Sequence, residues 1–148
     1  MYKHILVPTD GSTLAASGAK AGVKLAKALG AKVTGAYVIA PRVPPMYGEG
    51  IIYVPGVSAE AYKKSSEKAA REALAAVESK ARAAGVRCVT RFVTANHPWE
   101  GILKVARASK CDAIVMASHG RGGIRGLILG SETTRVLTHS KIPVLVIR

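Results

Sequence analysis

The chain has 148 residues, of which 49% are hydrophobic, and this length and composition favour a single domain with a buried core. The first residues run into an apolar stretch too short for a signal peptide, and no apolar run approaches the length of a membrane span. The formal charge of +13 suits polyanions, but the basic residues are dispersed and aromatic residues are few, which argues against nucleic acid and membrane partners.

The cysteines and histidines show no metal or disulfide pattern. Cys88 and Cys111 are far apart, at apolar-looking positions, so we predict that both are reduced core residues. The four histidines fall on different predicted elements without the spacing of metal ligands, so no metal site is expected. Together with the absence of a leader pattern, this predicts a cytoplasmic protein.

Short apolar runs alternate with segments of helical periodicity along the chain. Pro8 ends the first run, Gly30 ends the first helical pattern, and Ser58 is the expected N-cap of the second helix. The expected elements are a strand at 5–7, a helix over 14–28, a strand at 33–39, a long loop at 40–57, a helix over 58–84, an edge strand at 86–93, a helix beginning at 97–98, a strand at 113–116, a helix after 131 and a strand at 143–147.

This alternation predicts an α/β fold, a Rossmann-like open parallel sheet of five strands with helices on both faces. The strands at 5–7 and 113–116 are the most apolar, so we place them side by side at the centre, in the order 3-2-1-4-5. Ligands of such sheets bind where the strand order reverses, beyond the carboxyl ends of the strands. We therefore expect function in the segments 8–12 and 117–123.

The segment after the fourth strand is rich in glycine. Glycines let backbone N–H groups approach phosphate oxygens, and the predicted helix that opens at Gly130-Ser131 has a free, positively polarised N-terminus. Arg121 and Arg125 lie in the same segment and can offset negative charge. The alternative is a flexible surface connection. Neither a P-loop nor a dinucleotide fingerprint is present. The glycines are Gly120, Gly122, Gly123, Gly126 and Gly130.

These residues resemble the universal stress protein family. Its ATP-binding subclass carries Gly-x-x-Gly, nine residues, then Gly-Ser/Thr after the fourth strand. Gly120, the spacer 121–129 and Gly130-Ser131 match the later parts of this pattern, while Ala117 stands where the first glycine is expected. The opening at 3–12 and the ending at 143–147 are also similar to the family, so the resemblance covers the whole chain.

The resemblance implies a nucleotide site. Asp10 would bond the ribose, unless it only forms a turn before the first helix, and the backbone of Val38 would meet adenine. Amides of the glycine-rich segment would hold the phosphates. A branched side chain at Gly130 should occupy phosphate space and disfavour the loop conformation. The implied residues are Pro8, Thr9, Asp10, Val38, Met116, Ala117, Gly120, Arg121, Gly130, Ser131, Glu132 and Thr133.

The expected ligand is ATP, or else AMP or ADP, with any Mg²⁺ held by the phosphates because no second carboxylate accompanies Asp10. We predict no catalytic residue. Adjacent side chains such as Ser118 and His119 should diverge on an extended loop, which argues against a hydrolase. Hydrolysis should be slow or absent, because neither Arg121 nor Arg125 orients a water molecule. Ser118, Ser131 and Thr133 remain candidate phosphate acceptors, without a neighbouring base.

The last strand predicts a homodimer. It is an apolar edge with no later segment to cover its backbone groups, and the family resemblance implies the same pairing. Three functions stay open: a nucleotide-dependent switch in stress response or signalling, a dimeric scaffold of the same family without useful nucleotide affinity, and a slow ATPase or self-phosphorylating protein. The expected dimer contacts are Val144, Leu145, Val146 and Ile147.

Overall fold

The structure is a computed structural model that describes residues 1–41, 58–119 and 129–148. Most of the predicted 40–57 loop, together with Gly120, Arg121 and Arg125, lies outside these residues. Strands and helices alternate as predicted. They are β1 (His4–Pro8), α1 (Thr13–Leu29), β2 (Lys32–Ile39), α2 (Ala59–Ala83), β3 (Cys88–Thr94), α3 (Pro98–Ala108), β4 (Ala113–Ala117), α4 (Ser131–His139) and β5 (Val144–Ile147).

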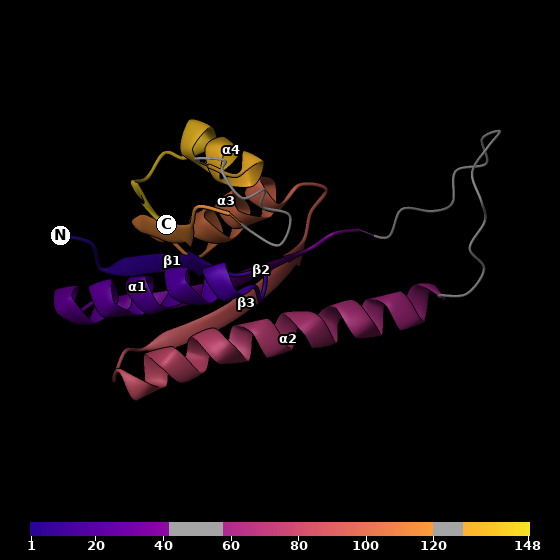
Figure 1. The fold of residues 1–148 in the computed structure, drawn as a ribbon, viewed down its shortest axis with the longest axis horizontal. Coiled ribbons are helices and arrows are strands. Elements are labelled where there is room, and N and C mark those ends of the chain that lie inside the picture. Colours follow the sequence, from indigo (N-terminus) through magenta and orange to yellow (C-terminus); the bar gives the residue numbers. More distant parts are fainter. Residues whose placement is uncertain (42–57, 120–128) are drawn as a thin grey trace.

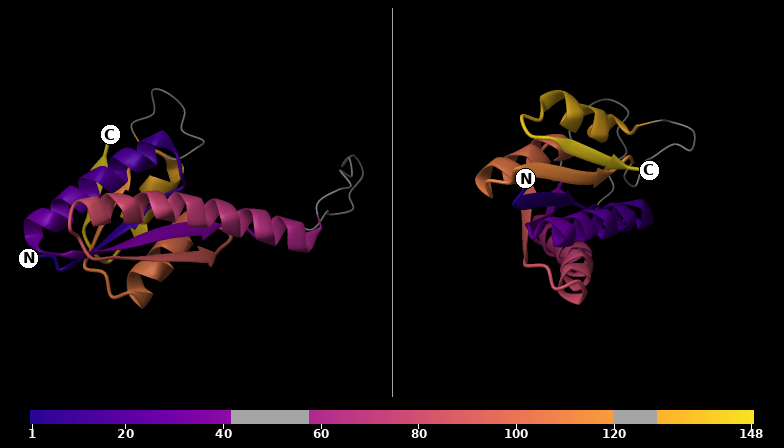
Figure 2. Two further views of the ribbon diagram at one scale, coloured as in Figure 1. Left: turned by 90° about the horizontal axis from the view of Figure 1, so that it is seen from below. Right: turned by 90° about the vertical axis from the view of Figure 1, so that its left-hand side faces the viewer.

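The strands form one parallel sheet in the order β3-β2-β1-β4-β5, which confirms the predicted topology. Figure 1 shows the sheet between two helical layers, and the right-hand view of Figure 2 separates α3 and α4 on one face from α1 and α2 on the other. The order reverses between β1 and β4, both of which are buried along their whole length. Their continuous apolar sequences are those of strands covered on both faces.

Each face of the sheet has its own apolar core. Ile5 and Val7 of β1 pack with α1 and α2, whereas Leu6 between them packs with α3 on the opposite face. This is the two-residue alternation of a strand. β3 is an edge strand, so Cys88 is only partly buried, contrary to the prediction that both cysteines lie in the core; Cys111 is buried. Both thiols are free.

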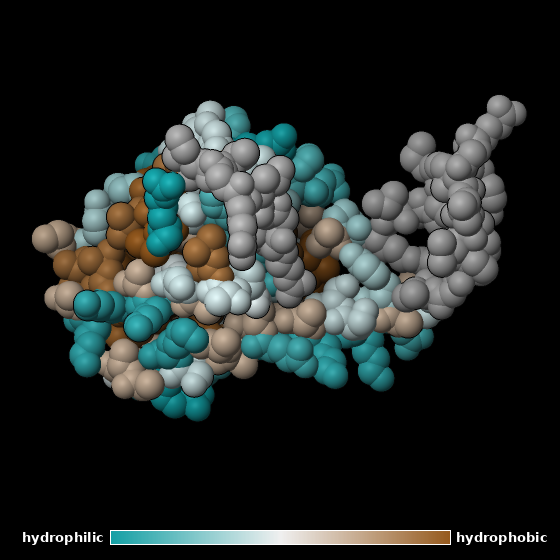
Figure 3. Space-filling view, in the orientation of Figure 1, coloured by the Kyte–Doolittle hydropathy of each residue, from teal (hydrophilic) through white to brown (hydrophobic). Residues whose placement is uncertain are grey.

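Helix α2 extends well beyond the sheet, as Figure 1 shows. None of its residues before Ala70 is buried. Ser58 caps it as predicted, accepting a hydrogen bond from the backbone N–H of Ala61 at 3.0 Å. Figure 3 shows hydrophilic side chains along the outer side of this helix and apolar side chains around the C-terminal strand. Among the described residues, no helix is both long and apolar enough to span a bilayer.

Candidate functional site

A cavity of about 390 Å³ opens at the carboxyl ends of β1, β2 and β4, at the point where the strand order reverses. Every predicted site residue that the structure describes lines it. Gly120 and Arg121 fall outside the described residues. The residues brought together are Pro8, Thr9, Asp10, Val38, Met116, Ala117, Gly130, Ser131, Glu132 and Thr133.

The turn after β1 forms one wall of the cavity. The backbone N–H of Thr9 donates to the Ala36 carbonyl at 2.9 Å, which continues the pairing with β2 beyond the end of β1. Oδ1 of Asp10 accepts from the N–H of Ser12 at 2.9 Å, and Ser12 in turn caps α1. Asp10 is therefore a turn former, as the structural alternative predicted, and it lines the cavity as well.

Met116 and Ala117, both buried at the end of β4, form the floor. Ala117 keeps strand geometry and has no positive φ, so alanine suits this position as well as glycine does. Helix α1 approaches it closely at Gly18. A Cβ added to Gly18 would lie 2.9 Å from the backbone nitrogen of Ala117, so only glycine lets the helix pack at this depth.

The N-terminus of α4 forms the opposite wall. Gly130 is the N-cap, and its N–H donates to the Ser118 carbonyl at 2.8 Å. The buried Thr133 hydroxyl donates to the carbonyls of Ala117 and Ser118, at 3.2 and 3.0 Å, and so ties α4 to the end of β4. Three backbone N–H groups at this end form no hydrogen bond with another described residue: those of Ser131, Glu132 and Thr133. An anion can therefore bind to these first amide groups of the helix.

Gly130 differs from its prediction in one respect. Its φ of −71° and ψ of 155° are extended angles that any residue adopts, so the backbone conformation does not require glycine here. Space does. An added Cβ would lie 3.1 Å from the Ser118 carbonyl oxygen and 3.5 Å from His119. The expected effect of a branched residue at Gly130 is consequently steric.

The Glu132 side chain links two helices beside the cavity. Its Oε2 accepts a hydrogen bond from the backbone N–H of Trp99 at 2.9 Å, in the first turn of α3. His97, the N-cap residue of α3, makes no capping bond with its own side chain, so Glu132 supplies the acceptor. A carboxylate at this end also complements the helix dipole. The N-termini of α3 and α4 are thus joined.

The prediction that Ser118 and His119 diverge is wrong. Ser118 Oγ lies 3.1 Å from His119 Nδ1, within hydrogen-bonding distance. The backbone bends directly after β4, so the two side chains do not point to opposite sides as in an extended strand. His119 Nε2 is buried without a partner among the described residues, and no described carboxylate bonds this ring. Within the described part of the chain, the pair therefore lacks the third group of a catalytic triad.

Six further residues line the cavity that the sequence did not predict. Pro98 and Ile102 come from α3, which approaches β2 closely at Gly101, where an added Cβ would lie 2.6 Å from the methyl groups of Val38. A glycine among the apolar residues on the buried face of this amphipathic helix was the available signal. The six are Ala15, Ala36, Tyr37, Pro98, Ile102 and His119.

Residues 1–41, 58–119 and 129–148 contain no group of three or more histidine, cysteine, aspartate or glutamate side chains placed to hold a metal ion. Within these segments the cavity offers backbone amides, hydroxyls and one ring nitrogen, together with two carboxylates, those of Asp10 and Glu132, which are too few to form a metal cluster. This chemistry suits an anionic ligand better than a bare divalent cation.

Polar groups at the opposite end of the sheet bond to one another. The Asp112 carboxylate accepts from the N–H groups of Lys3 and His4, at 2.8 and 3.0 Å, and His4 Nε2 lies 2.7 Å from Thr34 Oγ1. Burial lowers the pKa of His4 below its ordinary 6.5, and the positive charge of Lys32 lowers it further. Burial opposes ionisation of Asp112, but the backbone hydrogen bonds together outweigh it and hold its pKa below 3.8.

Comparisons with known proteins agree with this architecture. The model of the universal stress protein family matches residues 1–148. Universal stress protein MJ0531 of Methanocaldococcus jannaschii is 33% identical over 151 aligned positions, which cover all of this chain and 83% of that protein. The solved structure of UspA from Lactobacillus plantarum has a TM-score of 0.78 at 23% identity, covers 99% of this chain and 98% of its own, and supports the fold.

Among the similar structures that contain a nucleotide, one shares more than a quarter of its aligned residues with this chain. It is a universal stress protein in complex with cAMP, with a TM-score of 0.68 and 27% identity to this chain. The superposition covers 99% of this chain and 97% of the other.

Proposed function

The chain belongs to the universal stress protein family, and from this premise we propose that it binds an adenine nucleotide in the cavity at the carboxyl ends of β1, β2 and β4. One observation carries the proposal. The first amides of α4 lack partners among the described residues and border a cavity of about 390 Å³, which suits a nucleotide in size. A similar protein of the family, solved in complex with cAMP, supports the same ligand class.

Each wall of the cavity has a distinct role in this proposal. The backbone of Val38 and the apolar side chain of Ile102 bind the base, while Asp10 bonds the ribose from the turn after β1. The phosphates lie at the N-terminus of α4, where backbone N–H groups and the helix dipole attract negative charge. We assign Gly120 and Arg121, which lie outside the described residues, to the phosphates on the sequence alone, and Pro8, Thr9, Met116 and Ala117 support the nucleoside.

ATP is the proposed ligand because three amides and the adjoining glycine-rich segment provide for more than one phosphate. AMP and ADP are the alternatives. Mg²⁺ binds through the phosphates of the nucleotide, since the described residues supply no carboxylate cluster for it.

Mass spectrometry of small molecules released from freshly purified protein tests the proposal most directly. We expect an adenine nucleotide, and calorimetry of the emptied protein should show tighter binding of ATP than of GTP. If the emptied protein bound neither ATP, ADP nor AMP at millimolar concentration, the proposal would fail, and the scaffold function would be favoured instead.

We propose further that ATP is held and not turned over efficiently, as in a nucleotide-dependent switch in stress response. Phosphoryl transfer needs a group that orients the nucleophile. His119 bonds Ser118 and no described carboxylate, and Asp10 serves the turn before α1. Self-phosphorylation is confined to Ser131, which is exposed, because Ser118 and Thr133 are buried. Turnover near about 1 per second, abolished by His119→Ala, would contradict a switch.

Pairing through β5 is the proposed route to a homodimer. Ile114 N donates to the Pro143 carbonyl and Ser118 N donates to the Ile147 carbonyl, so odd-numbered residues of this strand face β4. Val144 and Val146 therefore direct their N–H and C=O groups outward, and Leu145, whose side chain is 47% exposed, keeps its N–H in the ladder.

This geometry determines which proline substitution tests the dimer. Val146→Pro removes only an outward donor and should yield folded monomers, whereas Leu145→Pro breaks a bond to β4 and should unfold the edge of the sheet. Sedimentation at tens of micromolar, roughly the range of ordinary interfaces, separates the outcomes. A parent protein that sediments as a monomer at this concentration would contradict the dimer.

A further inference from the structure

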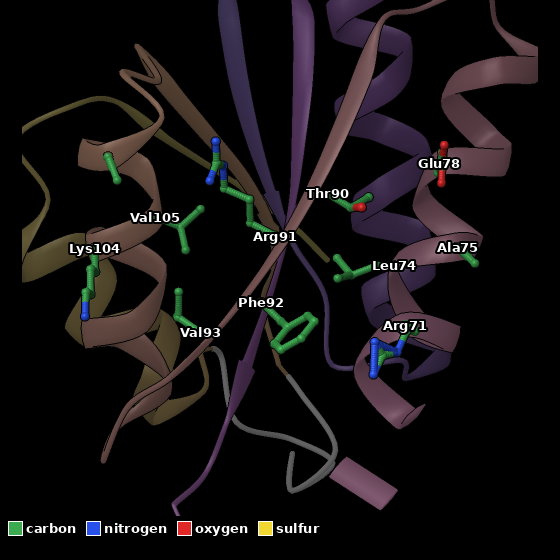
Figure 4. A pocket seen from close by; sticks show the side chains of 11 residues that line it. Arg71, Leu74, Ala75, Glu78, Thr90, Arg91, Phe92, Val93, Lys104 and Val105 are labelled. Carbon is green, nitrogen blue, oxygen red and sulfur yellow. The ribbon is translucent and has the colours of Figure 1, made fainter. Parts of the chain in front are cut away.

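The other edge of the sheet carries a groove that the proposed nucleotide site does not use. It has a volume of about 590 Å³ and lies along β3, between α2 and α3. Figure 4 shows Thr90 and Phe92 on the side of α2, and Arg91 and Val93 on the side of α3, where Lys104 also lies. The groove thus lies along the edge of the sheet, and side chains of α2 and α3 form its two sides.

The backbone of β3 presents unpaired groups along this groove. Arg87 O accepts from Val33 N at 2.8 Å, and Ala95 N donates to Ile39 O at 3.1 Å, so the odd-numbered residues face β2. In a parallel ladder the residues between them direct both N–H and C=O away from the neighbouring strand. These groups form no hydrogen bond with another described residue. The outward residues are Cys88, Thr90, Phe92 and Thr94.

The α2 side and the α3 side of the groove differ in polarity and charge. On the side of α2, Phe92 is 37% exposed and borders Leu74, which gives an apolar surface. On the side of α3, Arg91 and Lys104 are both exposed, and neither forms an ion pair with a described residue. A strand in this groove would therefore meet apolar groups on one of its faces and positive charge on the other.

The remaining charges of the groove are already paired. Arg71 bonds Glu67 at 2.7 Å and lies over the Phe92 ring, 5.9 Å from its centroid. Glu78 pairs with Arg82 at 3.5 Å. The unpaired charge of the groove among the described residues is consequently positive.

We propose that β3 binds an extended acidic segment of a partner protein, which adds to the sheet as a further strand. Its backbone satisfies the outward N–H and C=O groups of β3. Because successive side chains of a strand point to opposite faces, a segment that alternates carboxylates with apolar residues places the carboxylates toward Arg91 and Lys104 and the apolar groups toward Phe92.

Charge selects this occupant over a second copy of the chain. Pairing of β3 with its own copy would bring unpaired arginine and lysine side chains of both copies to one interface, where like charges repel. Positive side chains on an edge strand commonly prevent such self-pairing. The same charges attract a strand of opposite sign, so an acidic partner removes the repulsion that excludes the copy.

A synthetic peptide tests the proposal. The probe is a capped, fluorescently labelled peptide of about nine residues, a usual strand length, in which glutamate alternates with valine. We expect saturable binding that weakens at least about tenfold between about 0.05 and about 0.5 M salt. Two control peptides, one with lysine in place of glutamate and one with the same residues in two blocks, should bind at least about tenfold more weakly.

Two sets of variants locate the binding. Thr90→Pro removes an outward N–H without breaking a bond to β2, and should weaken binding at least about tenfold, whereas Thr90→Ala keeps the donor and should not. Arg91→Glu with Lys104→Glu should abolish binding. Lys24→Glu with Lys27→Glu, which makes the same change of net charge on exposed positions of α1, should retain it. Nucleotide affinity should be the same in all of them.

Several outcomes would overturn the proposal. They are no saturable binding up to about 1 mM, the weak limit of specific association, equal affinity for the lysine or block peptide, or equal affinity of the doubly substituted Arg91 and Lys104 variant. Self-association that is lost on Arg91→Glu would assign the groove to a second copy. Preferential binding of an oligonucleotide would assign it to nucleic acid. If Thr90→Pro fails to fold, the charge variants and the peptide controls still decide.

Discussion

The two ends of the central strands differ in whether their polar groups are hydrogen-bonded within the protein. At the amino end, the Asp112 carboxylate takes the N–H groups of Lys3 and His4, and the His4 ring bonds Thr34. At the carboxyl end, the first amides of α4 bond no described residue and border a cavity. We call the amino end, whose polar groups bond one another, the closed end, and the carboxyl end, whose helix amides have no described partner, the open end. The closed end stabilises the sheet, whereas the open end can bind a ligand.

This contrast has a physical basis. A buried polar group left without a partner costs free energy, so an end that serves only stability satisfies its groups internally. Leaving helix amides open costs less at a cavity that solvent or a ligand can enter. Substitutions at the carboxyl end should accordingly change ligand affinity, and those at the amino end should change stability.

The largest effect is expected at the open end. Gly130→Val places a branched side chain where even a Cβ would approach the Ser118 carbonyl to 3.1 Å, and so displaces the phosphates. We expect nucleotide affinity to fall at least about a hundredfold, the equivalent of two charge-assisted hydrogen bonds. Calorimetry measures the affinity. Thr138→Val, an exposed position near the C-terminal end of α4, is the matched control and should bind normally; equal affinity of both variants would exclude this phosphate site.

At the closed end, Asp112→Ala should lower stability without changing nucleotide affinity. The substitution removes the acceptor of two backbone N–H groups, and we expect a loss of about 1–3 kcal/mol in urea unfolding. Asp112→Asn keeps one carbonyl oxygen as an acceptor and should lose less. A drop in nucleotide affinity as large as the drop in stability would show that the two ends are not independent.

Glu132 bears on both stability and nucleotide affinity, because its carboxylate, which projects from α4 beside the cavity, caps α3. Glu132→Gln keeps the shape but weakens the bond to Trp99 N, so stability should fall by about 0.5–1 kcal/mol. Affinity should change only a few-fold, since the backbone amide at this position remains. Glu100→Gln, an exposed acidic residue in the first turn of α3, is the control. Equal losses in the two variants would remove the capping role.

Sequence patterns predicted the sheet because the central strands are continuous apolar runs, and they predicted the cavity wall because strand order dictates which turns meet. They did not predict contacts that depend on helix packing. Glu132 and Trp99 are 33 positions apart, and no periodicity links a carboxylate to a distant helix N-terminus. The predicted divergence of the Ser118 and His119 side chains is wrong because the backbone bends after β4, whereas the prediction assumed extended backbone. Cys88 is only partly buried, since edge strands bury only part of their side chains.

The smallest effect concerns pH and the closed end alone. Burial and Lys32 lower the pKa of His4 below 6.5 in the folded protein, whereas the unfolded chain titrates near 6.5. Below this pH the unfolded state binds the proton first, so the free energy of unfolding should decrease as the pH falls from 6.5 toward the lower folded pKa. Asp112, whose pKa lies below 3.8, stays ionised in this range and does not contribute to the slope.

Urea unfolding at several pH values between about 7.5 and 5, the range in which histidine ordinarily titrates, measures this dependence. His4→Asn removes the titrating ring, so its free energy of unfolding should vary less over the range, although the variant is less stable at neutral pH because the bond to Thr34 is lost. His97→Asn alters an exposed histidine and should keep the parent's slope. Identical slopes in His4→Asn and the parent would mean that His4 does not couple folding to protonation. A ring whose pKa is lowered by burial must regain its ordinary pKa when the chain unfolds, and this change would produce a difference in slope.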